Sequence, residues 1–325
     1  MTQRRAVIRG CGGYVPARIV TNDEVAQWVE TSHEWIVERT GIHTRHFAAE
    51  GEYTSDLATN AALEALNAAG LKPEDIDLIV VGTATPDHTF PATATRVQAK
   101  LGCKRGLAFD VAAVCSGYLV ALATAESFLI QGRAKTALVI GAETFSRILD
   151  RTDRRTCPLF GDGAGAVVLQ AVEPQDNPQD RGILGIYLYS DGQHYDLLYT
   201  DGGPSTAQGT GYIRMEGREV FRHAVTKLSE VAEEALTRQN LTLENIDWLI
   251  PHQANIRIIN ALGKKLNLNA ERIITTVDQH ANTSAASIPL ALHKAVADKR
   301  LKQGDIILHE AIGGGLVWGA AVIRW

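Results

Sequence analysis

The segment Glu74-Asp75-Ile76-Asp77-Leu78-Ile79-Val80 recurs further along the chain as Glu244-Asn245-Ile246-Asp247-Trp248-Leu249-Ile250, at an offset of 244 − 74 = 170 residues. The same offset relates Ala65-Leu66 to Ala235-Leu236, which precede the two segments. Because several matches occur in one order, they indicate an internal duplication.

The apolar residues around these segments predict two similar α/β halves. Each half reads as a helix, a short loop and an apolar strand without polar alternation, which is typical of a buried sheet. Residues 116–130 are apolar almost all round, so we expect a central helix that is covered on every side. The polar residues 173–180 are the predicted joint, which divides the chain into halves 1–173 and 174–325.

The composition excludes several classes of protein. The chain has 325 residues, with 32 Lys and Arg against 37 Asp and Glu, so its formal net charge is -5. This balance argues against a nucleic-acid-binding protein, which needs a basic excess. No apolar run approaches the roughly 18 residues that span a bilayer, and residues 1–10 lack the apolar region of a secretory signal. We expect a soluble, cytoplasmic protein without a membrane or nucleic-acid partner.

The four cysteines, Cys11, Cys103, Cys115 and Cys157, are scattered and form no CxxC pair. This spacing predicts neither a metal site nor a disulfide framework. Cys115 stands in Asp110-Val111-Ala112-Ala113-Val114-Cys115-Ser116-Gly117, which runs from a strand end into the predicted central helix. The N–H groups of a helix start favour a thiolate and can hold an oxyanion. The alternative is a buried structural cysteine.

Two further polar residues and a glycine run are candidates for the same site. His252 follows an apolar strand, where functional groups of α/β folds collect, or it is a hydrogen-bonded loop residue. Asn282 precedes a helical run and is either a helix cap or a site residue. Since 115 + 170 = 285, its segment is the repeat counterpart of the Cys115 turn, so we expect the two helix starts to meet. Gly313-Gly314-Gly315 is a hairpin turn or a close approach of backbone to a reacting carbonyl.

Together these segments resemble the β-ketoacyl-acyl carrier protein synthase III family, the condensing enzymes that initiate bacterial type II fatty acid synthesis, within the thiolase-fold superfamily. The resemblance extends from Gly12 to Ala321. It implies a thiolase-like α/β fold, with two duplicated halves in five layers, α-β-α-β-α. It is carried by six stretches in the family's order: Glu34-Trp35-Ile36, Arg39-Thr40-Gly41-Ile42, residues 110–117, Phe160-Gly161-Asp162-Gly163-Ala164-Gly165, Pro251-His252-Gln253-Ala254-Asn255 and Gly313-Gly314-Gly315.

The family's Cys-His-Asn triad corresponds to Cys115, His252 and Asn282. Elongating synthases of this fold carry a second His in place of the Asn. Thiolases need a second catalytic cysteine near the C-terminus, whereas the last cysteine here is Cys157. Plant-type polyketide synthases share the triad but have longer chains. These differences favour an initiating synthase.

The resemblance implies a decarboxylating condensation. Cys115, as a thiolate, takes the acyl group of a short acyl-CoA, acetyl-CoA first of all. Malonyl-acyl carrier protein then loses CO2, and hydrogen bonds from His252 and Asn282 stabilise the enolate, which attacks the acyl-cysteine. The backbone N–H groups of Cys115 and Gly314 form the oxyanion hole. No cofactor or metal is implied, because acyl-CoA and malonyl-acyl carrier protein are substrates.

Other positions match the family's binding residues, whose side chains suit the stacking of a flat base, the pairing of phosphate and the attraction of an acidic carrier protein. The alternatives are ordinary core aromatics and a solvated helix face. Many family members have Phe where this chain has Ile312, so the resemblance does not determine the preferred length of the acyl chain. The expected sets are Trp35, Arg39, Arg154 and Asn255 for CoA and pantetheine; Phe90 (reaching across a homodimer), Met215, Phe221 and Ile312 for the acyl pocket; and Arg222, Arg257, Lys264 and Lys265 for the carrier protein.

Three rival hypotheses stay open. The same fold and triad serve acyltransferases and condensing enzymes of secondary-metabolite or signal-molecule pathways, and only substrate competition separates these from fatty acid synthesis. A Cys-His-Asn hydrolase of the papain type would release the acyl group to water, but the chain lacks that family's local signature around the cysteine. A non-catalytic binding module leaves the triad unexplained.

Overall fold

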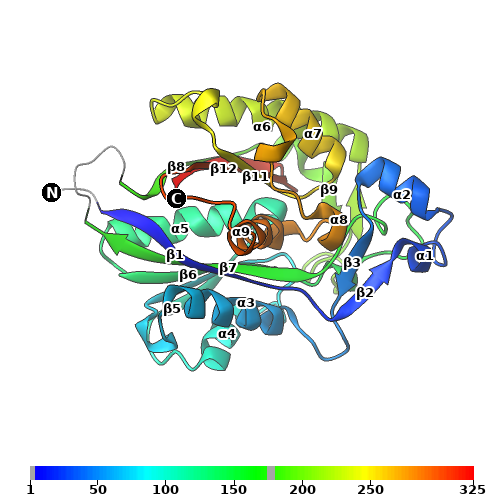
Figure 1. The fold of residues 1–325 in the computed structure, drawn as a ribbon. Coiled ribbons are helices and arrows are strands. Elements are labelled where there is room, and N and C mark those ends of the chain that lie inside the picture. The colour runs from blue at the N-terminus through cyan, green and yellow to red at the C-terminus, as the bar shows by residue number, and fades with distance from the viewer. Residues whose placement is uncertain (1–3, 174–179) are drawn as a thin grey trace.

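The computed structural model describes residues 4–173 and 180–325. Two β-sheets alternate with three layers of helices (Figure 1). Residues 174–179 of the predicted joint lie outside the described part of the chain, so the boundary between the two halves stays a prediction.

The first sheet has the strand order β1-β7-β6-β4-β5. Its strands span Arg5–Tyr14 (β1), Gly163–Val172 (β7), Thr136–Glu143 (β6), Leu78–Gly82 (β4) and Leu107–Val111 (β5). β4 is parallel to both β5 and β6, whereas β7 is antiparallel to β6 and β1. Helices α3 (Thr54–Ala69) and α4 (Thr93–Leu101) cover the outer face, and α5 (Gly117–Ile130) and α9 (Ser287–Ala297) cover the inner face.

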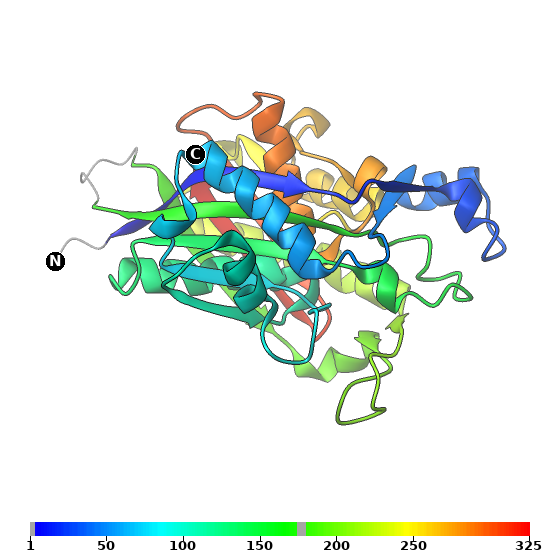
Figure 2. The same cartoon turned by 90° about the horizontal axis from the view of Figure 1, so that it is seen from below.

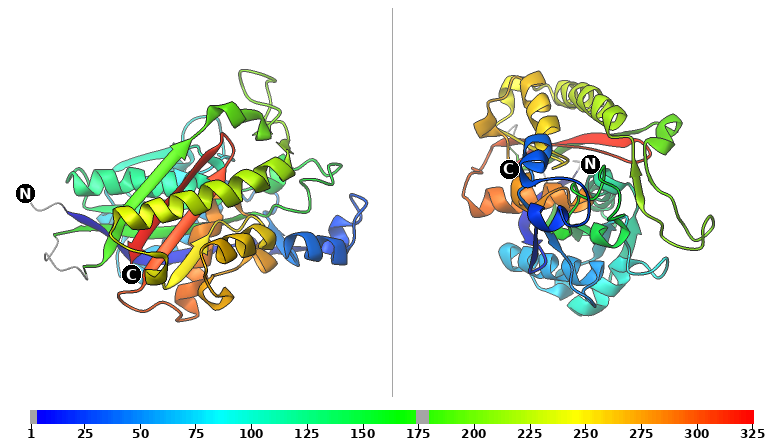
Figure 3. Two further views of the ribbon diagram at one scale, coloured as in Figure 1. Left: turned by 90° about the horizontal axis from the view of Figure 1, so that it is seen from above. Right: turned by 90° about the vertical axis from the view of Figure 1, so that its right-hand side faces the viewer.

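The second sheet lies on the other side of α5 and α9 and has the order β11-β12-β13-β8. Its strands span Trp248–Pro251 (β11), Ile306–Gly313 (β12), Val317–Arg324 (β13) and Gly182–Ser190 (β8). Helices α6 (Gly217–Arg238) and α7 (Ile256–Lys265) form the fifth layer, and the end view in Figure 3 shows the layers one above another.

Smaller elements extend from this body. Strands β2 (Arg18–Thr21) and β3 (Thr44–Phe47) pair near helices α1 (Asn22–Val25) and α2 (His33–Thr40). Strands β9 (Leu198–Thr200) and β10 (Ile213–Met215) form an arm that stands out in Figure 2. The one-turn helix α8 (Val277–His280) packs against β3.

The predicted duplication is confirmed by the element boundaries. Helices α5 and α9 begin 170 residues apart, as do β4 and β11, and β6 and β12 begin and end at that offset. The five-layered thiolase-like fold implied by the resemblance is also confirmed. The central, almost entirely apolar helix predicted for residues 116–130 is α5, which is in contact with strands of both sheets.

The repeated aspartates explain part of the opening motif. The Asp77 carboxylate accepts hydrogen bonds from the backbone N–H groups of Lys135 and Thr136, at 2.9 and 3.1 Å, where β6 begins. The Asp247 carboxylate accepts one from Ile306, at 2.8 Å, where β12 begins. Each aspartate thus satisfies backbone donors at the start of the neighbouring parallel strand. In the described residues, no helix is both long and apolar enough to cross a membrane.

Candidate active site

Cys115 lies in a tight backbone turn between β5 and α5. The 3₁₀ turn Val114–Ser116 begins with Val114 at a φ of 47°, which is a strained conformation for a β-branched residue. The repeat counterpart of Val114 is Ser284, which opens the turn Ser284–Ala286 at a φ of 50°. The two turns are in contact. The helix starts of α5 and α9 therefore meet, as the repeat predicted.

Glycines let the strand ends approach these turns. A Cβ atom on Gly313, at the end of β12, would lie 2.7 Å from the Cys115 backbone nitrogen. A Cβ atom on Gly141, in β6, would lie 2.1 Å from the Ala285 carbonyl oxygen. Neither position tolerates a side chain without displacing backbone. The Gly313–Gly315 run is thus a β12–β13 hairpin turn, and it also lies directly against the Cys115 turn.

His252 is held by the end of β11 and by α9. Its backbone N–H donates to the Glu310 carbonyl oxygen at 2.7 Å, and its Nδ1 lies 2.6 Å from Ser287 Oγ. Ser287 Oγ already accepts a hydrogen bond from the Gln253 N–H at 3.3 Å, so its own proton is available for Nδ1. This arrangement favours the tautomer with the ring proton on Nε2, and burial lowers the pKa of His252 to about 3. His252 is a neutral hydrogen-bond donor.

Asn282 presents its amide in a similar way. Its Oδ1 accepts a hydrogen bond from the Ser284 backbone N–H at 2.9 Å, and its backbone N–H donates to the Leu159 carbonyl oxygen at 2.9 Å. Because Oδ1 is engaged, the Nδ2 group is the part of the side chain that remains for a substrate oxygen. Asn282 therefore both caps a turn and lines the cavity described below.

The ionisation of Cys115 differs from the expected thiolate. The residue is only 4% exposed, and burial raises the pKa of its thiol to about 12. The negative charge of Glu143 raises this pKa further, whereas a hydrogen bond with Ser284 and the local backbone lower it. Desolvation outweighs the helix start. The resting Cys115 side chain is therefore a neutral thiol.

A cavity of about 510 Å³ contains most of the predicted binding residues. Its lining includes the four residues expected to bind CoA and pantetheine, together with Asn282. The Trp35 ring lies near two guanidinium groups, with the Arg154 and Arg39 carbon atoms 4.6 and 5.7 Å from its centroid. Asn255 caps α7 by accepting a hydrogen bond from the Ile258 N–H at 3.0 Å.

The residues expected in the acyl pocket lie in three different places. Met215 and Phe221 line the same cavity as Trp35. Ile312 is buried beside Gly313, next to the Cys115 turn. Phe90 lies outside the cavity lining and is 82% exposed. A single chain therefore does not bring the four together.

The predicted carrier-protein residues lie on the outer helices α6 and α7. Arg222 pairs with Glu219 at 2.7 Å, and Arg257 lies 5.8 Å from the Phe221 ring centroid and also lines the cavity. Lys264 is exposed at the end of α7. Lys265 donates a hydrogen bond to Ser229 Oγ at 2.9 Å, so its ammonium group already has an internal partner.

Three polar residues at this site were not predicted from the sequence. Ser284 and Ser287 lie in the same segment as Asn282, but their spacing along the sequence does not reveal their hydrogen-bond partners. Glu143 stands at the end of β6. Glu143 therefore meets the same criterion as His252, because functional groups of α/β folds collect at the ends of strands. Among the described residues, no group of three His, Cys, Asp or Glu side chains could hold a metal ion.

The five-layered fold, with a cysteine at the start of its central helix, defines an enzyme of the thiolase-like class. Family models described as 3-oxoacyl-[acyl-carrier-protein (ACP)] synthase III and as its C-terminal part match residues 109–192 and 236–325. The chain therefore belongs to the 3-oxoacyl-[acyl-carrier-protein] synthase III family.

Similar proteins extend the match over the whole chain. The β-ketoacyl-[acyl-carrier-protein] synthase III of Rhodospirillum centenum is 63% identical over 321 residues, which is 99% of each chain. That of Paramagnetospirillum magneticum is 61% identical over 98% of this chain and 99% of its own. The crystal structure of 3-oxoacyl-[acyl-carrier-protein] synthase III from Aquifex aeolicus has a TM-score of 0.92 at 46% identity, covering 98% of this chain and all of its own. The predicted family is confirmed, and with it a condensing acyltransferase of fatty acid biosynthesis.

The state of His252 can be tested directly. We expect its imidazole nitrogens, in ¹⁵N NMR spectra, to give the pattern of the neutral ring with the proton on Nε2, without titration between pH 5 and 8. The reason is that its pKa, at about 3, lies below this range. Ser287→Ala should change the tautomer pattern, because the donor to Nδ1 is lost. A resonance that titrates within this range in the wild type would contradict the neutral donor.

Proposed function

We propose that Cys115, His252 and Asn282 carry out the condensation, with Cys115 as the nucleophile. The thiol attacks the carbonyl carbon of an acyl-CoA, the CoA sulfur leaves, and the acyl group is held as a thioester. The observation that carries this proposal is the meeting of the two helix starts, which brings the Asn282 segment against the Cys115 turn. It is supported by the 4% exposure of Cys115, since a buried acyl-thioester is protected from water.

In the second half-reaction the donors His252 Nε2–H and Asn282 Nδ2 bind the thioester oxygen of malonyl-acyl carrier protein. Loss of CO2 places negative charge on that oxygen, and fixed hydrogen-bond donors in a water-poor site stabilise it. The enolate carbon then attacks acyl-Cys115. Because decarboxylation creates the carbanion in place, no strong base is required, which agrees with a neutral His252.

The oxyanion of the acyl-cysteine needs its own donors. We assign these to the backbone N–H groups of Cys115 and Gly314. The close approach of Gly313 to the Cys115 nitrogen supports this assignment, because it brings the β12–β13 turn beside the cysteine. A side chain at Gly313 would push the two N–H groups apart.

The cavity beside Trp35 suits the nucleotide end of CoA. An indole and two guanidinium groups can stack on the adenine, and arginines pair with phosphate oxygens in a forked geometry. Asn282 lines the inner part of the same cavity, so a pantetheine arm that enters past Asn255 leads toward the catalytic residues. We propose acetyl-CoA as the first substrate, with Ile312 leaving more room than a Phe would for a longer acyl group.

The nucleophile and the acyl preference are tested by intact-mass spectrometry. After mixing with a panel of acyl-CoAs of increasing length, the wild type should gain one acyl group, fastest with acetyl-CoA, and Cys115→Ser should gain none that persists. Addition of malonyl-acyl carrier protein should then release the acyl group as a 3-oxoacyl product.

Other results of that experiment would redirect the proposal. If no acyl-CoA labels Cys115, the proposed nucleophile is wrong. Release of the acyl group to water alone would point to a hydrolase. A preference for a long or branched acyl group would favour a specialised pathway, such as that of the priming β-ketosynthase from the R1128 polyketide pathway, whose structure is similar with a TM-score of 0.92 and 32% identity.

We also propose that Arg222, Arg257 and Lys264 guide the acidic carrier protein. Arg257 is exposed and lines the cavity, so a partner that docks there can feed its pantetheine arm inward. Lys265 contributes less, because its ammonium group is bonded to Ser229. Complementary charge mainly accelerates association and is weakened by salt.

Charge reversal separates carrier docking from chemistry. The variant Arg222→Glu should raise the KM for malonyl-acyl carrier protein roughly several-fold at low salt, while the acylation of Cys115 by acetyl-CoA continues, because Arg222 does not line the CoA cavity. Arg238→Glu reverses one arginine at the other end of α6 and is the matched control. Equal effects of the two variants on KM would place the carrier protein elsewhere.

A homodimer is proposed from the exposed edge of the first sheet. β5 is an edge strand whose Leu107 is 51% exposed, and an open apolar edge is a template for pairing with a second copy. The 82% exposed Phe90 would then reach the partner's acyl pocket.

We also propose that the enzyme is located in the cytoplasm. The four buried cysteines are free thiols, which agrees with the reducing conditions of that compartment.

Sedimentation tests the dimer. The wild type should sediment at twice the 35.2 kDa of one chain, and Leu107→Asp should sediment as a monomer because a buried charge opposes pairing. Leu63→Asp on α3 is the matched control, since Leu63 is equally exposed at 49% and lies away from the edge. A monomeric wild type, or a dimer that survives Leu107→Asp, would contradict this interface.

A further inference from the structure

Glu143 is a buried acid directly behind the Cys115 turn. Its side chain is fully buried at the end of β6, and its carboxylate accepts hydrogen bonds from four residues. The donors are the Thr83 hydroxyl at 3.2 Å, the Ala84 N–H at 3.0 Å, the Thr85 hydroxyl at 2.6 Å and the Ser284 hydroxyl at 3.1 Å. A carboxylate that only accepts hydrogen bonds is the form that can take a proton.

Ser284 connects this acid to the nucleophile. Its hydroxyl donates to Glu143 Oε1 at 3.1 Å, and the turn that Ser284 opens is in contact with the Cys115 turn. The residue holds a left-handed backbone conformation, with a φ of 50°. Such strain is kept where the surrounding structure requires it, and here it holds the hydroxyl against the carboxylate behind the Cys115 turn.

Of the groups near the thiol, Glu143 is the better proton acceptor. His252 Nδ1 already accepts a hydrogen bond from Ser287, and the pKa of the ring is lowered to about 3, so His252 holds a proton from sulfur poorly. Burial raises the pKa of Glu143 to about 7, with its hydrogen bonds opposing that rise. A general base works best when its pKa lies near the working pH. Transfer of the proton through one hydroxyl takes two steps, from sulfur to Ser284 and from Ser284 to Glu143.

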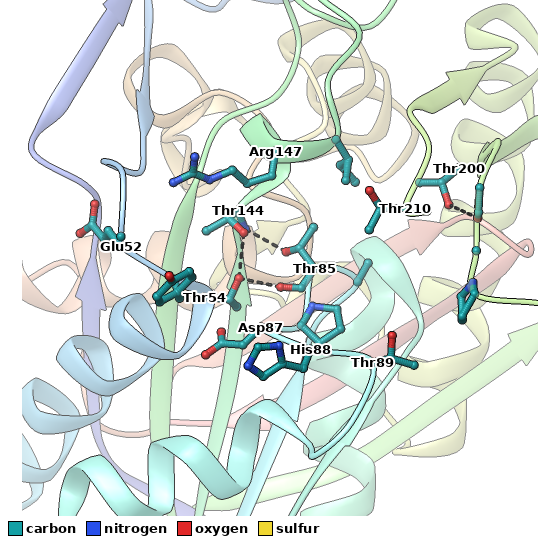
Figure 4. A pocket seen from close by; sticks show the side chains of 18 of the residues that line it. Glu52, Thr54, Thr85, Asp87, His88, Thr89, Thr144, Arg147, Thr200 and Thr210 are labelled. Carbon is teal, nitrogen blue, oxygen red and sulfur yellow. Dashed lines mark hydrogen bonds between the residues drawn. The ribbon is translucent and has the colours of Figure 1, made fainter. Parts of the chain in front are cut away.

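A second cavity offers a route by which Glu143 can exchange its proton with the solvent. This cavity, of about 910 Å³, is lined by Thr85, whose hydroxyl donates to Glu143, and by Thr54 and Thr144. Figure 4 shows these three threonines hydrogen-bonded to one another at the cavity wall. Glu143 is therefore one hydroxyl away from water on that side, although it is itself buried.

We propose that Glu143 is a positioning residue that accepts the Cys115 proton through Ser284 during acylation and returns it after condensation. As the Cys115 sulfur bonds to the acyl carbon, its proton moves to Ser284 Oγ, and the Ser284 hydroxyl proton moves to Glu143 Oε1. The bond from the acyl carbon to the CoA sulfur breaks, and the CoA thiolate takes a proton from water.

The second half-reaction restores the resting state. When the enolate carbon displaces the acyl group from Cys115, the thiolate that leaves recovers its proton from Glu143 through Ser284. Over the whole cycle one carboxylate is lost as CO2 and one proton is taken from water, so charge and atoms balance. The inference rests on the proposed role of Cys115 as the nucleophile.

The test measures the rate at which acetyl-CoA acylates Cys115, by rapid mixing and intact-mass spectrometry from pH 5.5 to 8.5. In the wild type this rate should rise with pH to a plateau with a midpoint near 7, because Glu143 accepts a proton only when it is ionised. Glu143→Gln keeps the shape and the acceptor oxygen of the side chain. It should slow acylation about 100-fold or more at pH 8 and remove the midpoint. Ser284→Ala should have the same two effects.

Glu126→Gln is the matched control. Glu126 lies on α5, the helix that begins after Cys115, and burial also raises its pKa to about 7, but it has no contact in the Ser284 network. This variant should keep the wild-type rate and midpoint. Melting temperature and the KM for acetyl-CoA show whether each variant is folded and binds its substrate.

The outcomes are distinct. Wild-type rates in both Glu143→Gln and Ser284→Ala, or slower rates with an unchanged midpoint, would overturn the relay and leave Glu143 a structural residue. If Glu143→Gln does not fold, Ser284→Ala decides alone, because it leaves the other donors to Glu143 in place. If the wild type itself is not acylated on Cys115, the proposed nucleophile fails instead of the relay.

Discussion

The structure depends on the packing of two helix starts against each other inside the protein. Helices α5 and α9 lie between the two sheets, and the turns that begin them are in contact. Both turns use a residue at positive φ, Val114 and Ser284, and both rest against strands that need glycine at the contact. Because the buried residues of α5 are almost all apolar, the polar side chains of the site lie at the start of the helix. The site lies where the packing leaves room for hydrogen bonds.

The same burial sets the ionisation of every reacting group. It raises the pKa of Cys115 and of Glu143 and lowers that of His252, since in each case desolvation penalises the charged form. The donors that face the substrate are therefore neutral N–H groups, and the ionised carboxylate that the relay requires is confined to Glu143, behind the Cys115 turn. In the proposed reaction, negative charge develops on substrate oxygens, where fixed donors stabilise it without reorganising water. A thiol in such surroundings needs a proton acceptor of matched pKa, and this requirement leads to Glu143.

The sequence predicted more of the fold than of the hydrogen-bonding at the site. The offset of 170 residues anticipated the layers, because aspartates, apolar strands and helix starts repeat along the chain itself. It also brought Asn282 to Cys115. It could not assign Ser284 or Ser287, since a serine is compatible with many roles and its partners are set by the packing of α9. The ionisation of Cys115 was misjudged for a related reason: the helix start is visible in sequence, whereas the depth of burial is not. Phe90 depends on a second chain, and no pattern within one chain specifies that contact.

The duplication also explains why the site is asymmetric. Four of the proposed functional side chains stand opposite a small residue at the repeat position: Cys115 with Ala285, His252 with Gly82, Glu143 with Gly313 and Ser287 with Gly117. Ser284 is the exception, because it stands opposite Val114. These small residues are required by space. A Cβ atom on Gly82 would lie 2.5 Å from the Gly117 carbonyl oxygen, and one on Gly313 would lie 2.7 Å from the Cys115 nitrogen.

The point where the helices meet therefore has room for one set of catalytic groups, not two. Atoms this close to backbone would force the turns apart, and interiors are packed too densely to absorb that movement. In the proposed mechanism one half supplies the nucleophile and its proton acceptor, and the other supplies the imidazole, the amide and the bridging hydroxyl. This division is possible because each half has small residues where most of the other half's reacting side chains lie. The Ala285 side chain faces the start of α5, where a Cβ atom on Gly117 would lie 3.2 Å from the Ala285 Cβ atom, so a larger side chain at position 285 would crowd that helix start. The repeat thus builds one site from two halves.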